Sequence, residues 1–303
     1  MPLDPDFRER FAPFAGVEFA DLLRDQALRT RYEEAFTKRA GYRAPAVDTT
    51  DVLIDGPAGP LRLRVYEPRD PSGDVVVWVH GGGFVAGSID MVEADVVSRE
   101  LCRRARSRVV SVDYQVAGAG IAYPVLHREV VAAYRWARAG AARLTLAGAS
   151  AGGNLALAAT LEMRASGDEL PARLGLIYPA LHRQLPPLTG VDGEVDALPP
   201  PLRFDEGRID AMFAAYLGGT DHAPYASADG HDLTGLPPCL VVVNEYDDLR
   251  PSGERFAADA IAAGVDVDLV HVPGMPHGHL NMTPLVPQTA ATLDRLAAFA
   301  AGG

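Results

Sequence analysis

The stretch Leu-Thr-Leu-Ala-Gly-Ala-Ser-Ala-Gly-Gly-Asn at residues 144–154 decides the expected fold. Its first four residues have the character of a buried strand, and the uncharged run from residue 152 onward predicts a buried helix. Between them lies the pattern Gly-x-Ser-x-Gly, whose small residues let Ser150 occupy a sharp, strained turn from strand to helix. The pattern alone would equally suit a glycine-rich turn, so the flanking elements are what make Ser150 a candidate nucleophile.

The rest of the chain supports an α/β fold with one main core. From about residue 50, strand-like and helix-like runs alternate, which predicts a mostly parallel central sheet with helices on both faces. Strands are expected at 50–55, 61–67, 74–80, 109–113, 144–147, 174–178, 239–244 and 265–272. Helices are expected at about 90–106, 126–140, 152–166, 252–263 and 288–301.

Composition excludes several classes of protein. The 303 residues carry a formal net charge of −12, and Lys38 is the only lysine, so nucleic-acid binding is not expected. Cys102 and Cys239 lie far apart and belong to no Cys/His cluster, which argues against a zinc site and a disulfide framework. The N-terminal residues MPLDPDFRER resemble no export signal, and we expect a cytoplasmic protein with no membrane span.

Two segments fall outside the alternation of strands and helices. Residues 18–40 are helical in composition and could bury one face that includes Phe19, Leu22, Leu23, Tyr32 and Phe36. Residues 181–230 are rich in proline but contain an amphipathic piece around 209–217. Because a structureless loop of that length is improbable in a compact domain, we expect a lid over a site.

A second motif, His80-Gly81-Gly82-Gly83-Phe84, follows the strand expected at 74–80. Successive glycines can present backbone N–H groups to an anion without obstruction by side chains. A phosphate-binding loop is disfavoured because no Gly-Lys-Ser/Thr follows, and the spacing of a dinucleotide fingerprint is absent. Together with Ser150, the loop predicts an oxyanion hole.

A serine nucleophile needs a base, and the base needs a carboxylate to orient it. Asp247 and Asp248 follow the strand expected at 239–244, and either can be the orienting acid. His277 lies in the turn after the last expected strand, at the same edge of the sheet, with His279 as the second choice for the base. The chain order Ser, Asp, His is that of α/β-hydrolases.

The other histidines have simpler interpretations. His271 is expected to pack or hydrogen-bond within a strand. Solvent exposure is the ordinary expectation for His182, His222 and His231, in or near the lid, and capping or exposure for His127, which opens a helix. No histidine has a spacing typical of metal ligands, so neither a metal nor a cofactor is expected.

Taken together, these motifs resemble the hormone-sensitive-lipase-like branch of the α/β-hydrolases, whose bacterial members are mostly carboxylesterases. The resemblance covers about residues 50–300 and rests on the motifs at 80–84, 148–154, 236–250 and 277–278. It implies that Ser150 is the nucleophile, Asp247 the acid and His277 the base, with oxyanion-hole amides from Gly82, Gly83 and Ala151. It also implies a small helical cap built from an N-terminal segment, residues 1–45, and an insertion, residues 181–230, over a core of residues 46–180 and 231–303.

The chain departs from the family pattern at several positions. Ala149 stands where an acidic residue is usual, which predicts that a polar contact behind the nucleophile is missing. The usual Asp-Tyr-Arg-Leu-Ala-Pro-Glu stretch becomes Asp-Tyr-Gln-Val-Ala-Gly-Ala at residues 113–119, and Asp-Pro-Leu-Arg-Asp becomes Asp-Asp-Leu-Arg-Pro at 247–251. His279 replaces a common aromatic residue. These changes affect the expected substrate preference rather than the triad.

The sequence therefore predicts a serine carboxylesterase for short- to medium-chain acyl esters of uncharged alcohols. The lid residues Phe204, Met212, Phe213 and Tyr216 favour an apolar substrate. One alternative is specialised chemistry on the same fold, such as deacetylation, amide cleavage, acyl transfer or elimination, and another is a non-catalytic binding module. By analogy with the fold, the edge at the last strand and helix is a candidate surface for a homodimer.

Overall fold

The computed structural model describes residues 3, 5–37 and 41–302 and contains one eight-stranded sheet. The strands lie in the order β1-β2-β4-β3-β5-β6-β7-β8, antiparallel from β1 to β4 and parallel from there to β8. Their bounds are β1 Asp48–Gly56, β2 Gly59–Glu67, β3 Val75–Val79, β4 Arg108–Val112, β5 Leu144–Ala149, β6 Arg173–Ile177, β7 Cys239–Tyr246 and β8 Val267–Pro276. All eight expected strands are present, and the predicted mostly parallel central sheet is confirmed.

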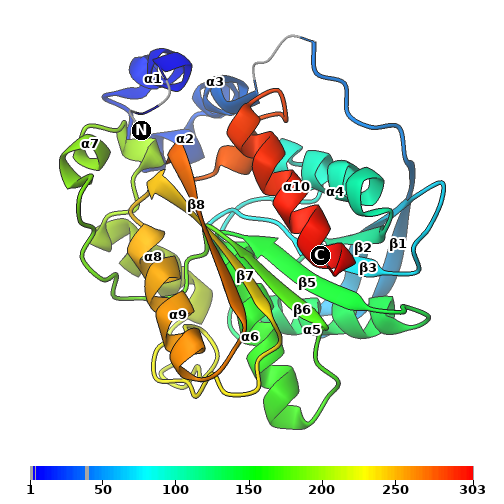
Figure 1. The fold of residues 1–303 in the computed structure, drawn as a ribbon. Helices are drawn as coiled ribbons and strands as arrows, with labels where there is room; N and C mark the ends of the chain where they lie inside the picture. Colours follow the sequence, from blue (N-terminus) through cyan, green and yellow to red (C-terminus); the bar gives the residue numbers. More distant parts are fainter. Residues whose placement is uncertain (1–2, 4, 38–40, 303) are drawn as a thin grey trace.

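The sheet separates two apolar cores because side chains alternate between its faces. In β3, Val75, Val77 and Val79 pack into one core, whereas Val76 and Trp78 pack into the other. Helices α5 Val125–Arg138, α6 Ala151–Ser166 and α9 Arg250–Ala262 cover the first face. Helices α4 Val92–Ala105 and α10 Pro287–Ala301 cover the second face and contact each other (Figure 1).

The two segments outside the alternation are both helical. The N-terminal segment contains α1 Pro5–Phe11, α2 Phe19–Arg24 and α3 Gln26–Thr37, of which α1 was not expected. Residues 38–40, expected to extend the helix, lie outside the described residues, as does the side chain of Leu23. The other segment contains α7 Asp192–Asp196 and α8 Glu206–Leu217, and α8 accounts for the amphipathic piece. In Figure 1, α1, α2, α3 and α7 lie together at one end of the sheet.

An aromatic cluster joins α1 to α3, and one arginine joins the N-terminal segment to the second segment. Phe7, Phe11 and Phe36 pack with ring centroids 4.2–6.0 Å apart. Arg208 of α8 places its guanidinium carbon 4.0 Å from the ring centroids of both Phe19 and Phe204, and its Nη1 donates to Pro201 O at 2.8 Å. Arg208 thus joins α2 to the second segment through stacking with two aromatic rings.

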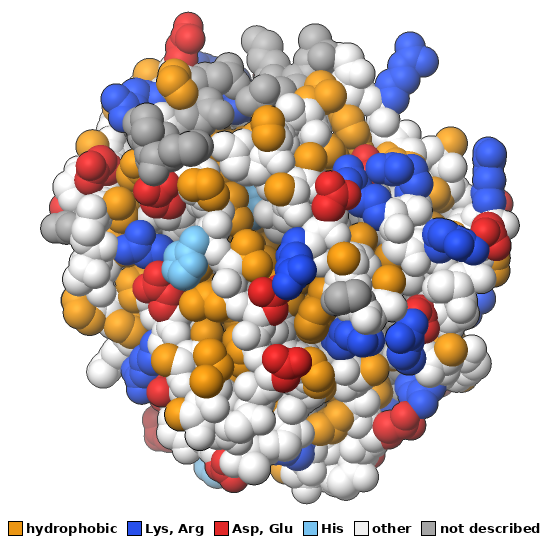
Figure 2. Space-filling model, in the orientation of Figure 1, with side chains coloured by type: hydrophobic (Ala, Val, Ile, Leu, Met, Phe, Trp, Pro, Cys, Tyr) orange, Lys and Arg blue, Asp and Glu red, His pale blue; other side chains and the backbone are white. Residues whose placement is uncertain are grey.

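On the surface, charged and apolar side chains are mixed. Figure 2 shows acidic, basic and hydrophobic side chains interspersed over the face that is drawn. Many of the charged groups are paired, for example Arg62 with Asp90 and Asp113 at 2.8 Å. Within residues 3, 5–37 and 41–302, no helix is both long enough and apolar enough to span a bilayer.

Candidate active site

Ser150 occupies the turn between β5 and α6, at φ 55° and ψ −120°. This left-handed conformation is strained for a residue with a side chain, and the close packing around the turn maintains it. A Cβ added to Gly152 would lie 2.2 Å from Val79 O, and the Ser150 N–H donates to Ile177 O at 2.9 Å. The turn therefore fits closely between β3 and β6 and projects Ser150 beyond the sheet.

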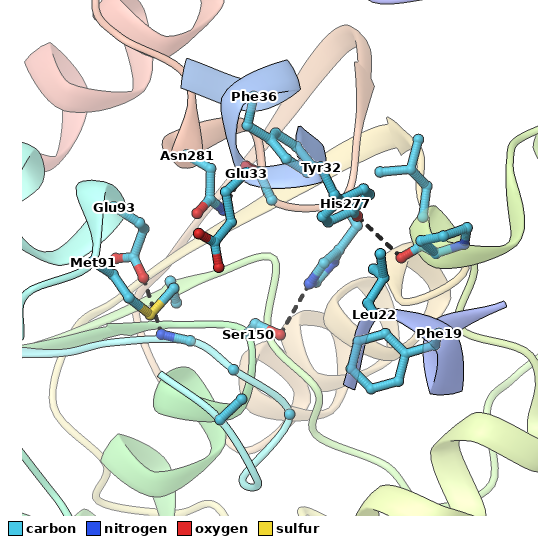
Figure 3. A pocket seen from close by; sticks show the side chains of 18 of the residues that line it. Phe19, Leu22, Tyr32, Glu33, Phe36, Met91, Glu93, Ser150, His277 and Asn281 are labelled. Carbon is cyan, nitrogen blue, oxygen red and sulfur yellow. Dashed lines mark hydrogen bonds between the residues drawn. The ribbon is translucent and has the colours of Figure 1, made fainter. Parts of the chain in front are cut away.

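The structure brings Ser150, His277 and Asp247 together at the carboxyl edge of the sheet. His277 follows β8 and Asp247 follows β7. His277 Nε2 lies 2.9 Å from Ser150 Oγ, and its Nδ1 lies 2.8 Å from Asp247 Oδ2. The other carboxylate oxygen of Asp247 accepts the Leu249 N–H at 2.9 Å. All three side chains are buried or nearly so, and Figure 3 shows His277 directed at Ser150.

A further contact aligns the two loops that carry these side chains. Asn244 is fully buried in β7, and its Nδ2 donates to Pro276 O at 2.7 Å. Because Pro276 immediately precedes His277, this hydrogen bond fixes the His277 loop relative to the loop of Asp247.

The alternative residues for acid and base occupy other places. Asp248 pairs with Arg203 at 2.9 Å and accepts the Phe204 N–H at 2.7 Å. His279 is fully buried, and its Nε2 lies 2.9 Å from Thr292 Oγ1. Burial lowers the pKa of His279 to about 3, so it is neutral at ordinary pH. Asp248 therefore holds residues 203–204, and His279 belongs to the packing between the His277 loop and α10.

The glycine loop lies beside Ser150 and has a backbone that only glycine accepts readily. Gly82 and Gly83 have φ values of 129° and 61°. A Cβ on Gly82 would lie only 1.9 Å from Ala86 O, because the loop turns tightly there and Gly82 O accepts the Ala86 N–H at 3.0 Å. Both glycines line the same cavity as Ser150, and Ala151 begins α6 directly after it.

The base of the glycine loop is supported from residues 113–119, the stretch that departs from the family pattern. The Tyr114 ring stacks on His80 with centroids 4.2 Å apart, and its hydroxyl donates to His80 O at 3.1 Å. Burial lowers the pKa of His80 to about 4, so its neutral ring can donate from Nδ1 to Gly81 O at 2.7 Å. Gln115 donates from its backbone and its side chain to Glu129.

Ser150 lies in a cavity of about 470 Å³ whose walls come from both segments outside the sheet. Phe204 and Met212, expected to form an apolar site, both line it, and the Phe204 ring lies 4.3 Å from the His277 ring between centroids. Phe213 and Tyr216 instead pack on Phe84 in the core. The apolar side chains around the cavity include those of Phe19, Leu22, Tyr32, Phe36, Val85, Met91, Leu202, Phe204 and Met212.

Two of the remaining histidines differ from expectation because they are buried. His182 is almost fully buried, with Nδ1 2.8 Å from Ser252 Oγ. His127 is fully buried, with Nε2 2.6 Å from Glu162 Oε2 and Nδ1 3.2 Å from the hydroxyl oxygen of Tyr216. Both were expected to be exposed or to cap a helix. His271 lies in β8 as expected and pairs with Glu254 at 2.8 Å.

Sequence reasoning missed several polar residues that line the cavity, including Glu33, Asn281 and Glu93. The most deeply buried of these is Glu93. It lies in the first turn of α4, where an acidic side chain is commonplace because it complements the helix dipole. The only available signal was its position within a helix that begins soon after the glycine loop. In the described part of the chain, no group of three or more His, Cys, Asp or Glu side chains is arranged to hold a metal ion.

Comparisons with known proteins agree with this architecture. A family model described as alpha/beta hydrolase fold matches residues 76–281. Carboxylesterase NlhH of Mycobacterium tuberculosis is 38% identical over 252 residues, which is 78% of this chain and 76% of the relative. Esterase LipI of the same organism is 32% identical, with coverage of 83% and 81%.

Solved structures show the same likeness over nearly the whole chain. A hyperthermophilic esterase from Pyrobaculum calidifontis has a TM-score of 0.84 and 31% identity, covering 99% of this chain and 98% of its own. The carboxylesterase EstE1, cloned from a metagenomic library, has a TM-score of 0.77 and 35% identity, with coverage of 91% and 96%. The predicted fold and ester-hydrolase activity are confirmed. The chain belongs to the α/β-hydrolase family, as a carboxylesterase of its hormone-sensitive-lipase-like branch.

Proposed function

We propose that this carboxylesterase uses Ser150 as its nucleophile, His277 as general base and acid, and Asp247 as the group that orients His277. The observation that carries the proposal is the position of His277, within hydrogen-bonding distance of Ser150 Oγ on one side and of Asp247 on the other. This geometry allows a neutral imidazole to take the serine proton while the carboxylate fixes its tautomer and stabilises the imidazolium.

Acylation begins when Ser150 Oγ attacks the ester carbonyl carbon and its proton passes to His277 Nε2. The carbonyl oxygen becomes an oxyanion, which the N–H groups of Gly82, Gly83 and Ala151 stabilise. As the tetrahedral intermediate collapses, the bond to the alcohol oxygen breaks and His277 donates its proton to that oxygen. The alcohol leaves, and the acyl group remains on Ser150.

Deacylation repeats these steps with water. His277 takes a proton from water as the water oxygen attacks the acyl carbon, and the same backbone amides hold the second oxyanion. Collapse breaks the bond to Ser150 Oγ, which recovers its proton from His277. The products are a carboxylic acid and the free enzyme, with no cofactor required.

The cavity supports short- to medium-chain acyl esters of uncharged alcohols as substrates. Its volume of about 470 Å³ lies in the lower half of the range for small-molecule sites, and its walls are largely apolar. We propose that residues 1–45 and 181–230 act as the cap over it, since both supply wall residues. The cytoplasmic location and the homodimer stay predictions.

The assignment of the nucleophile can be tested with a small fluorophosphonate and intact-protein mass spectrometry. Wild type should gain a single adduct, which Ser150→Ala should lack and His277→Ala should form much more slowly. Ser88→Ala is a matched control, because Ser88 lines the same cavity without a histidine partner, and it should label like wild type. Labelling or ester turnover that persists in Ser150→Ala would refute the proposal.

A series of p-nitrophenyl esters from acetate to dodecanoate tests the substrate class. We expect kcat/KM to be highest for acyl chains of about two to eight carbons and to fall beyond them, as the longer chain outgrows the cavity. A pocket discriminates by about 1–3 kcal/mol per methylene, so the decline should be measurable. A maximum at long chains, with activation at lipid interfaces, would contradict the proposed preference.

A further inference from the structure

Glu93 is a buried carboxyl group with an unusual set of partners. Its Oε1 accepts the indole N–H of Trp78 at 2.9 Å, and its Oε2 accepts the backbone N–H of Gly81 at 3.0 Å. The residue is 1% exposed, and no salt bridge in the described residues involves it. Figure 3 shows its side chain on the cavity wall, joined to the backbone nitrogen of the loop.

Gly81 stands between Glu93 and the nucleophile. A Cβ placed on Gly81 would lie 3.4 Å from Ala149 O, 3.5 Å from Ser150 Cβ and 3.7 Å from Glu93 Oε2. The peptide that Glu93 holds thus lies next to the serine turn, close enough that an added Cβ would touch it. Ala149, which replaces the usual acidic residue, contributes no carboxyl group there, whereas Glu93 brings one to the neighbouring loop from α4.

This contact can control the orientation of the oxyanion donors. The residues at 81–83 are all glycines, so no side chain of the loop itself restrains their peptide planes. The Gly81 N–H donates to Glu93 Oε2, and this hydrogen bond fixes the plane of the first peptide. The N–H groups of Gly82 and Gly83 follow directly along the chain, and an oxyanion donor is effective only when it is aimed within a few tenths of an ångström.

We propose that Glu93 is a positioning residue that holds the oxyanion loop through Gly81, an inference that rests on the proposed function of the loop. The carboxylate suits this role because both of its partners are donors, and two acceptor oxygens satisfy them simultaneously. A glutamine has one acceptor and one donor group, so it must turn its NH₂ towards either the Trp78 indole N–H or the Gly81 N–H.

That asymmetry gives a sharp test with four variants: Glu93→Leu, Glu93→Gln, Trp78→Phe and the double variant Glu93→Gln/Trp78→Phe. Each is assayed with p-nitrophenyl butyrate at pH 9, where the carboxyl is ionised. Glu93→Leu should lower kcat by about 10- to 100-fold, less than or similar to loss of one oxyanion donor, with KM within about 2-fold of wild type.

The glutamine variants distinguish positioning from general packing. Glu93→Gln should lose kcat, and Trp78→Phe alone should keep it within about 3-fold of wild type, because the Gly81 contact is intact. In the double variant the amide oxygen can face Gly81 with no opposing donor, so kcat should recover by several-fold over Glu93→Gln alone. A purely structural role predicts the reverse, since the second substitution enlarges a core cavity and adds damage.

The outcomes separate this inference from the proposed function. Wild-type kcat in Glu93→Leu, or a double variant slower than Glu93→Gln, overturns the positioning role even though Ser150→Ala is inactive. Ester turnover that survives Ser150→Ala refutes the proposed function instead. Far-UV circular dichroism and urea unfolding verify that each variant is folded. If Glu93→Leu does not fold, the comparison of Glu93→Gln with the double variant still tests the proposal, because glutamine nearly preserves the side-chain volume.

Discussion

Raising the pH through 7 should lower the free energy of unfolding of the protein, because the buried carboxyl group of Glu93 ionises. Burial disfavours its ionised form and raises its pKa from the ordinary 4.5 to about 7, despite hydrogen bonds from Trp78 and Gly81. Between these pH values the folded protein retains a proton that the unfolded chain has released, so stability falls as pH rises. At about 1.4 kcal/mol for each pH unit, the rise from 4.5 to about 7 corresponds to about 3 kcal/mol.

The assay is urea unfolding of wild type and Glu93→Gln at intervals between pH 4.5 and 8.5. Other titrating groups are common to both proteins and cancel in the difference. The residues that interact electrostatically with Glu93, Tyr114 and Tyr178, stay uncharged because burial raises the pKa of each. Wild-type stability relative to Glu93→Gln should fall by about 3 kcal/mol across this range. A difference that is flat, or that changes in the opposite sense, would refute the reasoning.

Three further perturbations follow from the same geometry. Asp247→Asn should lower kcat by about 10⁴-fold, whereas the matched Asp248→Asn, which removes a partner of Arg203, should change it far less, and equal losses in ester turnover would sink the assignment. Gly82→Ala should abolish turnover, because its Cβ would lie 1.9 Å from Ala86 O. Ester turnover by a Gly82→Ala variant whose circular dichroism is native would contradict this prediction. Between pH 6.5 and 4, wild type should lose about 1.4 kcal/mol of unfolding free energy for each pH unit of acidification because of His279, and His279→Gln should lack this loss. The reason is that the lowered pKa of His279, about 3, leaves the folded state short of a proton that the unfolded chain binds; an unchanged slope in urea unfolding would argue otherwise.

The sheet and its helices could be predicted from the sequence because burial imposes a clear pattern on them. The apolar run at Val75–Val79 is buried on both faces, and turn residues bound it on each side. The strand β5 is also an apolar, buried run, and the glycines of the serine turn that follows it indicate close packing. The helix α1 carries no such signal, because its seven residues include both charged and aromatic side chains. It is stabilised by tertiary contacts of its Phe7 and Phe11 rings with Phe36 of α3.

Contacts between distant polar residues were harder to predict. Sequence position left Asp247 and Asp248 equivalent until the structure showed which one faces His277. His127 and Glu162 lie on neighbouring helices, and nothing local indicates that they pair in the interior. Glu93 looked like an ordinary acidic residue in a first helical turn, because its partners, Trp78 and Gly81, come from another element.

The stacking of Arg208 between Phe19 and Phe204 has an evolutionary consequence. It joins the N-terminal segment to the segment of α8, about 180 positions apart in the chain. Neither segment contributes a strand to the sheet. Substitutions and insertions there can remodel the space above the nucleophile while the elements that hold the reacting groups remain unchanged. Changes in these two segments can therefore alter which esters bind, while the residues that catalyse the reaction stay in place.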